Sequence, residues 1–166
     1  MLRIKSSIPL LAALILVGCG SSSPTTSSTV TTGPKAATID RASYIAKADA
    51  LCKSSNDRQE ALRKRATGLP VTKLPPILRQ QAGIADTLAS GLGKLTPPTG
   101  DRATVGRFVR AVRQLSVYSK AVANSIAAGH AFASRALATK LSIARQQETL
   151  LGQGYGYKTC ASGKSY

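Results

Sequence analysis

The chain has 166 residues, the length of one ordinary domain, and its 23 Lys and Arg residues outnumber 7 Asp and Glu residues to give a net charge of +16. Five Tyr, two Phe and no Trp are few aromatic residues for a β-sandwich core, so the composition favours close-packed helices rich in Ala and Leu. One His and one Met, the initiator, exclude a haem held by a Met/His pair once the initiator is removed.

The first eighteen residues have the parts of a bacterial export signal. Arg3 and Lys5 precede an apolar run over residues 8–17. That run is about half of the roughly 20 residues that a spanning helix needs, so it predicts a signal and not a membrane anchor. The run ends in Leu16-Val17-Gly18-Cys19, which looks like a lipobox. We expect a lipoprotein signal peptide over residues 1–18; the alternatives are a secretory signal with an accidental cysteine and a buried apolar helix.

Lipidation of Cys19 predicts where the mature protein resides. A lipoprotein cysteine carries at least two acyl chains, such as palmitate, and two chains hold firmly because each buried CH₂ contributes about 0.8 kcal/mol. We therefore expect the protein at the extracytoplasmic face of the cell membrane, held through lipid on Cys19 and not through a spanning segment.

A spacer follows over residues 19–38. Ten of the twelve residues from 21 to 32 are Ser or Thr, which leaves too little apolar surface to offset the entropy of ordering the chain. The sequence predicts a disordered linker here, either bare or carrying O-linked sugars. A single domain is expected over residues 39–166.

Hydrophobic periodicity predicts four helices in this domain. The first covers residues 40–66, the second 74–95 and the fourth 131–151. The third is the clearest, because its apolar seam repeats at alternating intervals of three and four: Val105, Phe108, Val112, Leu115, Ser119, Val122 and Ile126. Thr99 or Asp101 is expected to cap it. Short connections between long helices favour an all-α, up-down-up-down four-helix bundle.

The last predicted helix is less regular, and the end of the chain is expected to be non-helical. Phe132, Ile143 and Leu150 lie on one edge of the helix, and Leu137, Leu141 and Ala144 lie beside that edge. Residues 152–166 hold a glycine-rich segment with Tyr155 and Tyr157. Glycine lowers helix propensity, so we expect the helix to end before this segment.

Two cysteines remain beside Cys19. In an oxidising compartment, Cys52 and Cys160 most simply form one disulfide, which would close a loop of about 110 residues and contribute roughly 4–5 kcal/mol. Two unpaired buried thiols are the alternative. A catalytic or metal-binding pair is less favoured, because the sequence has no Cys-x-x-Cys motif.

Three segments carry a resemblance to a known family. They are Tyr44–Cys52 followed by Asn56, the turn Leu95–Asp101, and the closing segment Gly154–Cys160. They resemble the first helix, the Pro-Pro turn and the tail of an uncharacterised family of secreted lipoproteins from actinobacteria. The resemblance implies a helical bundle closed by Cys52 and Cys160, and it implies no particular activity.

The charge predicts the kind of partner. Without residues 1–18 the chain keeps 21 basic and 7 acidic residues, a net charge of +14, which attracts anionic lipid or wall polymer. Basic residues are most closely spaced on the third helix, at Arg107, Arg110, Arg113 and Lys120. Solubility and helix-dipole complementation are the simpler interpretation of this charge. Nucleic acid is disfavoured, because no aromatic residue for base stacking is interleaved with these positions.

Candidates for catalysis or metal binding are few. The only glutamates, Glu60 and Glu148, have no His three residues on, so a di-metal carboxylate site lacks its ligands. His130 falls at the predicted turn before the fourth helix and is interpreted as a surface or capping residue. A triad built on it would need one of four carboxylates, with no Gly-x-Ser-x-Gly motif to supply the nucleophile: Asp49, Asp57, Asp86 or Asp101. We expect no metal, no cofactor and no catalysis.

Together these patterns predict a lipid-anchored, extracytoplasmic helical module with a non-enzymatic binding or envelope-organising role. A carrier that holds a small apolar ligand between its helices is the second hypothesis. An enzyme built on His130 is the third.

Overall fold

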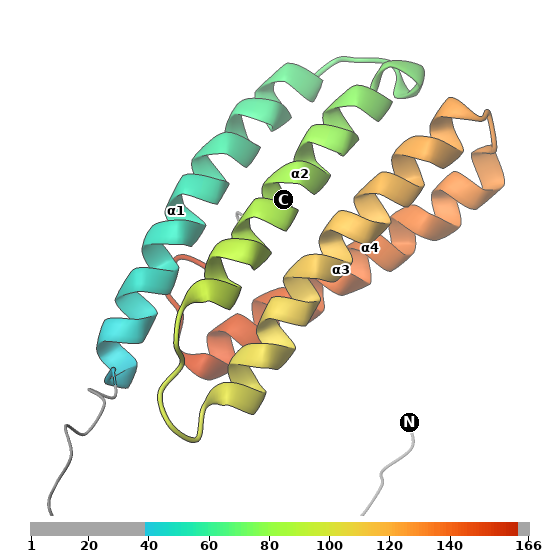
Figure 1. Ribbon diagram of the computed structural model, residues 1–166. Helices are drawn as coiled ribbons and strands as arrows, with labels where there is room; N and C mark the ends of the chain where they lie inside the picture. Colours follow the sequence, from blue (N-terminus) through green and yellow to red (C-terminus); the bar gives the residue numbers. More distant parts are fainter. Residues whose placement is uncertain (1–38, 163–166) are drawn as a thin grey trace, which may run out of the picture. The chain divides into compact units, whose positions relative to one another are not determined.

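The computed structural model describes residues 39–162, and every regular element within them is helical. The elements in chain order are α1 (Arg41–Ala66), the short 3-10 helix η1 (Val71–Lys73), α2 (Pro75–Lys94), α3 (Arg102–Ala127) and α4 (Ala131–Tyr155). Consecutive α-helices run in opposite directions (Figure 1). The predicted all-α fold of four helices is confirmed for this part of the chain. The expected signal peptide and linker lie outside the described residues.

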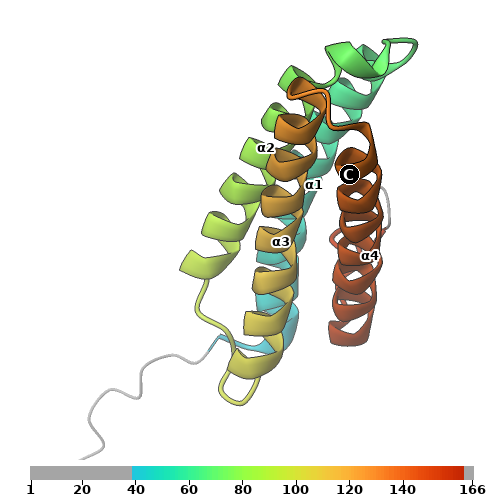
Figure 2. The same cartoon turned by 90° about the vertical axis from the view of Figure 1, so that its right-hand side faces the viewer.

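The helices pack as an open series and not as a closed ring. α2 lies against both α1 and α3, and α3 also lies against α4. In contrast, no Cα atom of α1 comes within 8 Å of a Cα atom of α4. Figure 2 shows α3 between α2 and α4. The segment that follows α4 runs back to α1 (Figure 1) and joins the two ends of the series.

Local side-chain chemistry sets the helix starts. Asp40 caps α1, because its Oδ1 accepts a hydrogen bond from the Ser43 backbone N–H at 2.9 Å. Pro75 occupies the first position of α2, where its missing N–H leaves no hydrogen bond unmade. Asp101 stands at the N-cap position of α3 but makes no capping hydrogen bond. Its Oδ2 instead accepts a hydrogen bond from the Tyr155 hydroxyl at 2.8 Å.

The end of α4 corrects an expectation, because the glycine-rich segment begins as helix and α4 continues to Tyr155. A Cβ on Gly152 would lie 3.3 Å from the Phe108 ring, so glycine allows α4 to approach α3 closely there. Continuing the helix also buries Tyr155, which is 3% exposed. The helix ends one residue later at Gly156, whose φ of +99° is a left-handed conformation that glycine adopts without strain.

The apolar seam of α3 faces the core, as its periodicity predicted. All of its members up to Val122 are buried. On α4 the structure distinguishes the two apolar edges: Leu141 and Ala144 are buried, whereas the other edge is open to solvent. The exposed edge carries Phe132 (87% exposed), Ile143 (48%) and Leu150 (67%).

Candidate functional site

The predicted lipidation site, Cys19, lies outside the described residues, so its modification stays a prediction. No helix within residues 39–162 is long and apolar enough to cross a membrane. The candidates that the structure can place are the cysteine pair, the basic residues of α3 and His130.

Cys52 and Cys160 form a disulfide, as the cysteine count predicted. It joins the middle of α1 to the segment after α4, with 5.1 Å between the two Cα atoms. Each cysteine is only 1% exposed. While the bond is intact neither sulfur can act as a thiolate nucleophile or metal ligand, so the role of the pair is structural.

Asp49 fastens the same segment to α1. Its Oδ1 accepts hydrogen bonds from the backbone N–H groups of Thr159 (2.9 Å) and Cys160 (3.0 Å). Its Oδ2 accepts a third from the Lys158 N–H at 3.0 Å, and the Asn56 side-chain amide donates to the Thr159 carbonyl at 3.2 Å. In the sequence, Asp49 stands out only as a possible triad member and as part of the Tyr44–Cys52 segment. In the structure it lies about one helical turn before Cys52, so both side chains face the returning segment.

Four aromatic rings pack together beside this returning segment, with 4.8 to 6.1 Å between the centroids of contacting rings: Tyr44, Phe108, Tyr155 and Tyr157. The Arg41 guanidinium lies 4.4 Å from the centroid of the Tyr155 ring. Burial, and then the Asp101 carboxylate, raise the pKa of Tyr155 to about 12, so its hydroxyl remains a hydrogen-bond donor at neutral pH. These aromatic side chains are engaged in packing.

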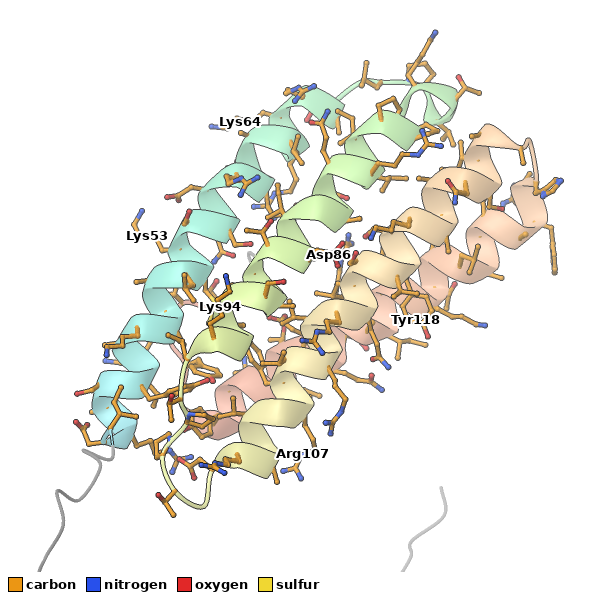
Figure 3. All side chains as sticks on the ribbon, in the orientation of Figure 1. Lys53, Lys64, Asp86, Lys94, Arg107 and Tyr118 are labelled. Atoms are coloured by element: carbon orange, nitrogen blue, oxygen red, sulfur yellow. A yellow bond between two sulfur atoms is a disulfide. The ribbon has the colours of Figure 1, made fainter. Side chains whose placement is uncertain are left out.

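The structure brings together three of the four basic residues predicted on α3. Arg107 and Arg110 line a groove between α3 and α4, and Arg110 and Arg113 line a second groove between α2 and α3. We name Arg107, Arg110 and Arg113 the cationic face. Figure 3 shows Arg107 near the start of α3 and Asp86 on α2.

Lys120 is not part of the cationic face, because its charge is paired with a carboxylate on another helix. Its Nζ lies 2.7 Å from Asp86 Oδ2, in an ion pair between α3 and α2. Burial acts to raise the pKa of Asp86, but the contacts with Lys120 and Ser116 together outweigh it, and the pKa is lowered overall. The charge of Lys120 is therefore balanced locally, which α3 alone could not reveal because Asp86 is 34 residues away.

The groove between α3 and α4 combines charge with apolar surface. Its volume is about 500 Å³, and it is open to solvent. α3 contributes two arginines, Ala111 and Gln114 to its lining, and α4 contributes Gln147, Leu150 and Leu151. The second groove, of about 310 Å³, adds Arg102 at the start of α3. Both grooves are therefore bordered by arginine.

Acidic residues are unevenly distributed among the helices. α3 contains no Asp or Glu, and α4 contains only Glu148. Glu148 is 1% exposed, and burial raises its pKa to about 8, so most of it is protonated at neutral pH. Neither helix therefore has an exposed carboxylate, whereas together they carry eight basic residues: Arg102, Arg107, Arg110, Arg113, Lys120, Arg135, Lys140 and Arg145.

No family model, no curated protein and no solved structure matches the chain. Membership of the lipoprotein family that the motifs resemble therefore stays a prediction.

His130 occupies the N-cap position of α4 and is exposed, without a capping hydrogen bond from its side chain. The four carboxylates considered for a triad contact other groups: Asp49 the returning segment, Asp57 Lys53, Asp86 Lys120, and Asp101 Tyr155. Among the residues that the structure describes, no group of three or more His, Cys, Asp or Glu side chains could hold a metal ion. Within residues 39–162, the structure thus brings no partner for acid–base chemistry to His130.

Two further hollows bear on the carrier hypothesis. One of about 540 Å³ lies between α1 and α2, beside Arg58 and Thr87, and one of about 750 Å³ lies beside the returning segment, at Lys53 and Lys158. These two and the two arginine-bordered grooves are all open to solvent. A carrier of a small apolar molecule would bury most of its ligand, and none of these four hollows encloses one.

Proposed function

We propose that the protein is a lipid-anchored, extracytoplasmic helical module that performs no catalysis and binds an anionic component of the cell envelope, lipid or wall polymer, through the cationic face. The observation that carries the proposal is the charge of α3 and α4. Their basic residues have no exposed carboxylate on the same two helices, because Glu148 is buried with its pKa raised to about 8.

The energies involved suit a tethered binder. A basic residue near an anionic surface contributes about 1 kcal/mol, so three arginines together change affinity on the order of a hundredfold. Acyl chains on Cys19 would keep the domain within reach of the envelope, so that a modest intrinsic affinity gives high occupancy. Solvent-exposed charges are screened by salt, so binding should weaken as ionic strength rises.

The test compares two charge reversals of equal size in the mature chain, residues 19–166. The first is Arg107→Glu, Arg110→Glu and Arg113→Glu on the cationic face. The control is Lys47→Glu, Arg58→Glu and Lys64→Glu, three exposed positions on α1. Binding to phosphatidylglycerol vesicles and to soluble polyglycerol phosphate is measured across a range of salt concentrations.

We expect the first variant to lose most binding and the control to keep most of it. Equal losses would mean that only the overall net charge matters, and the cationic face would then have no special role. Unchanged binding in both variants would leave solubility as the simpler explanation of the charge.

The anchor is tested separately in cells. Cys19→Ser should prevent lipidation, so the chain should lose its acyl mass and leave the membrane fraction. If mass spectrometry of the wild-type protein finds an unmodified cysteine at position 19, the lipid-anchored part of the proposal is wrong.

A further inference from the structure

The outer side of α4 carries a line of large apolar residues that the rest of the domain does not cover. Phe132, Ile143 and Leu150 are 87%, 48% and 67% exposed. They are separated by 11 and 7 residues, close to three and two helical turns, so they lie along one side of the helix. We name these three residues the apolar stripe. At 1.5 Å per residue it extends about 27 Å along α4.

The apolar stripe adjoins the cationic face. Leu150 lines the groove between α3 and α4 together with Arg107 and Arg110, so one end of the stripe borders two arginines directly. Further along α4, the exposed residues Arg135 and Lys140 lie between Phe132 and Ile143 in the sequence. The same side of the molecule therefore offers apolar side chains for burial and cations around them.

The chemistry of this surface distinguishes among possible occupants. A second copy of the chain would bring its own positive charge, +14 for the mature protein, against a pair of helices without an exposed carboxylate. A soluble anionic polymer would neutralise the arginines but would offer no apolar phase for Phe132 or Leu150. An anionic phospholipid leaflet satisfies both, because acyl chains accept the apolar side chains while headgroup phosphates face the cations.

We infer that α4 docks along the surface of an anionic phospholipid membrane, with the apolar stripe inserted at the headgroup boundary and the cationic face against the phosphates. This inference rests on the proposed function and specifies its partner as lipid. The length of the expected linker, residues 19–38, is compatible with this inference, because a chain of twenty residues can span at most about 65 Å. The axis of α4 would then run parallel to the membrane surface.

The experiment uses the mature chain with Cys19→Ser, so that binding belongs to the polypeptide and not to attached lipid. The test variant is Phe132→Ser, Ile143→Ser and Leu150→Ser. The control is Leu69→Ser and Val71→Ser, two exposed apolar residues near the connection of α1 to α2. Circular dichroism and thermal unfolding establish that each variant is folded. Binding is measured by flotation with vesicles of equal phosphatidylcholine and phosphatidylglycerol, and by retention on soluble polyglycerol phosphate.

We expect the test variant to bind the vesicles at least about tenfold more weakly than the control, since partial burial of three large apolar side chains is removed. Its binding to the soluble polymer should not change. Vesicle binding equal to that of the control would overturn the docking of α4, while salt-dependent binding lost on charge reversal would still support the proposed function. If the unaltered chain binds neither vesicles nor polymer, the proposed function itself fails.

A second measurement locates the contact directly. The chain contains no Trp, so Phe132→Trp and Leu150→Trp each introduce a single fluorescent reporter on the stripe, and Leu69→Trp provides the control. On adding the anionic vesicles, emission from the two stripe positions should move to shorter wavelength and be quenched by brominated acyl chains, and emission from position 69 should not. Quenching at position 69 alone would contradict docking through α4.

Discussion

Asp49 on α1 accepts a hydrogen bond from the backbone N–H of Cys160 at 3.0 Å, immediately beside the disulfide that Cys160 forms with α1. The same carboxylate also binds two further N–H groups of the returning segment. The backbones of α1 and α4 do not approach each other closely. This carboxylate and the disulfide, together with the contacts of Tyr44 and Arg41 with the Tyr155 ring, therefore hold the two ends of the helix series to each other.

Asp49→Asn should destabilise the domain by about 2–3 kcal/mol, because hydrogen bonds to a charged acceptor are lost and one side-chain oxygen becomes an NH₂ group facing backbone donors. Urea unfolding at neutral pH measures the change. Asp57→Asn is the matched control on the same helix: Asp57 pairs only with exposed Lys53, so its loss should cost at most about 0.5 kcal/mol. Equal effects of the two variants would show that Asp49 has no special role.

Removing the disulfide with Cys52→Ser and Cys160→Ser should cost about 4–5 kcal/mol, because the bond closes a loop of 108 residues in the unfolded chain. That is a large part of the 5–15 kcal/mol typical of a domain, so the variant should unfold well below the wild-type temperature. Thermal unfolding of the wild type with and without reductant provides the comparison. Identical midpoints under oxidising and reducing conditions would contradict the prediction.

Glu148→Gln should stabilise the domain at neutral pH and remove a pH dependence. Burial raises the pKa of Glu148 from 4.5 to about 8, so the folded state binds this proton more tightly than the unfolded state does. The free energy of unfolding is therefore highest below about pH 4.5, where Glu148 is protonated in both states. It falls as the pH rises towards 8, because the unfolded state then loses this proton and the folded state keeps it. Glutamine stays neutral, and the gain at pH 7 should be on the order of 3 kcal/mol. Chemical unfolding from pH 4 to pH 9 measures it; parallel curves for the two proteins would refute the assignment.

Gly152→Ala and Gly154→Ala should have opposite effects although they lie two residues apart on α4. A Cβ at position 152 would meet Ala161 Cβ at 3.2 Å and the Phe108 ring at 3.3 Å, whereas a Cβ at position 154 meets nothing within 4 Å. We expect Gly152→Ala to lower stability by about 1–3 kcal/mol and Gly154→Ala to raise it by about 0.5–1 kcal/mol. Thermal unfolding of the two variants measures these changes. If both substitutions raised the unfolding temperature, α4 would have to be able to shift away from α3.

The sequence predicts the first three helices well because their signals are local. Heptad-like spacing on α3, the two prolines at the start of α2 and Asp40 before α1 each act within one or two turns. The disulfide could also be predicted, since only two cysteines remain beside Cys19. None of these signals depends on how the helices are arranged relative to one another.

The misjudged features depend on contacts between distant residues. Glycine in the segment after residue 151 indicated a break, but close packing against Phe108 and burial of Tyr155 extend α4 through it. The two apolar edges of α4 could not be ranked by periodicity, because both fit a helix and only the position of α3 decides which is buried. The spacing along α3 alone groups Lys120 with the arginines, because its partner, Asp86, lies on another helix.

The covalent link between Cys52 and Cys160 also has a mechanical consequence. A pulling force applied to the two ends of the chain would pass through the disulfide and bypass the 108-residue loop that it closes. Only the chain before Cys52 and the chain after Cys160 could be extended. Tension on the chain that precedes α1 would therefore unravel the first turns of α1 but leave α2, α3 and α4 unloaded. A single-molecule extension trace would lengthen sharply only after reduction.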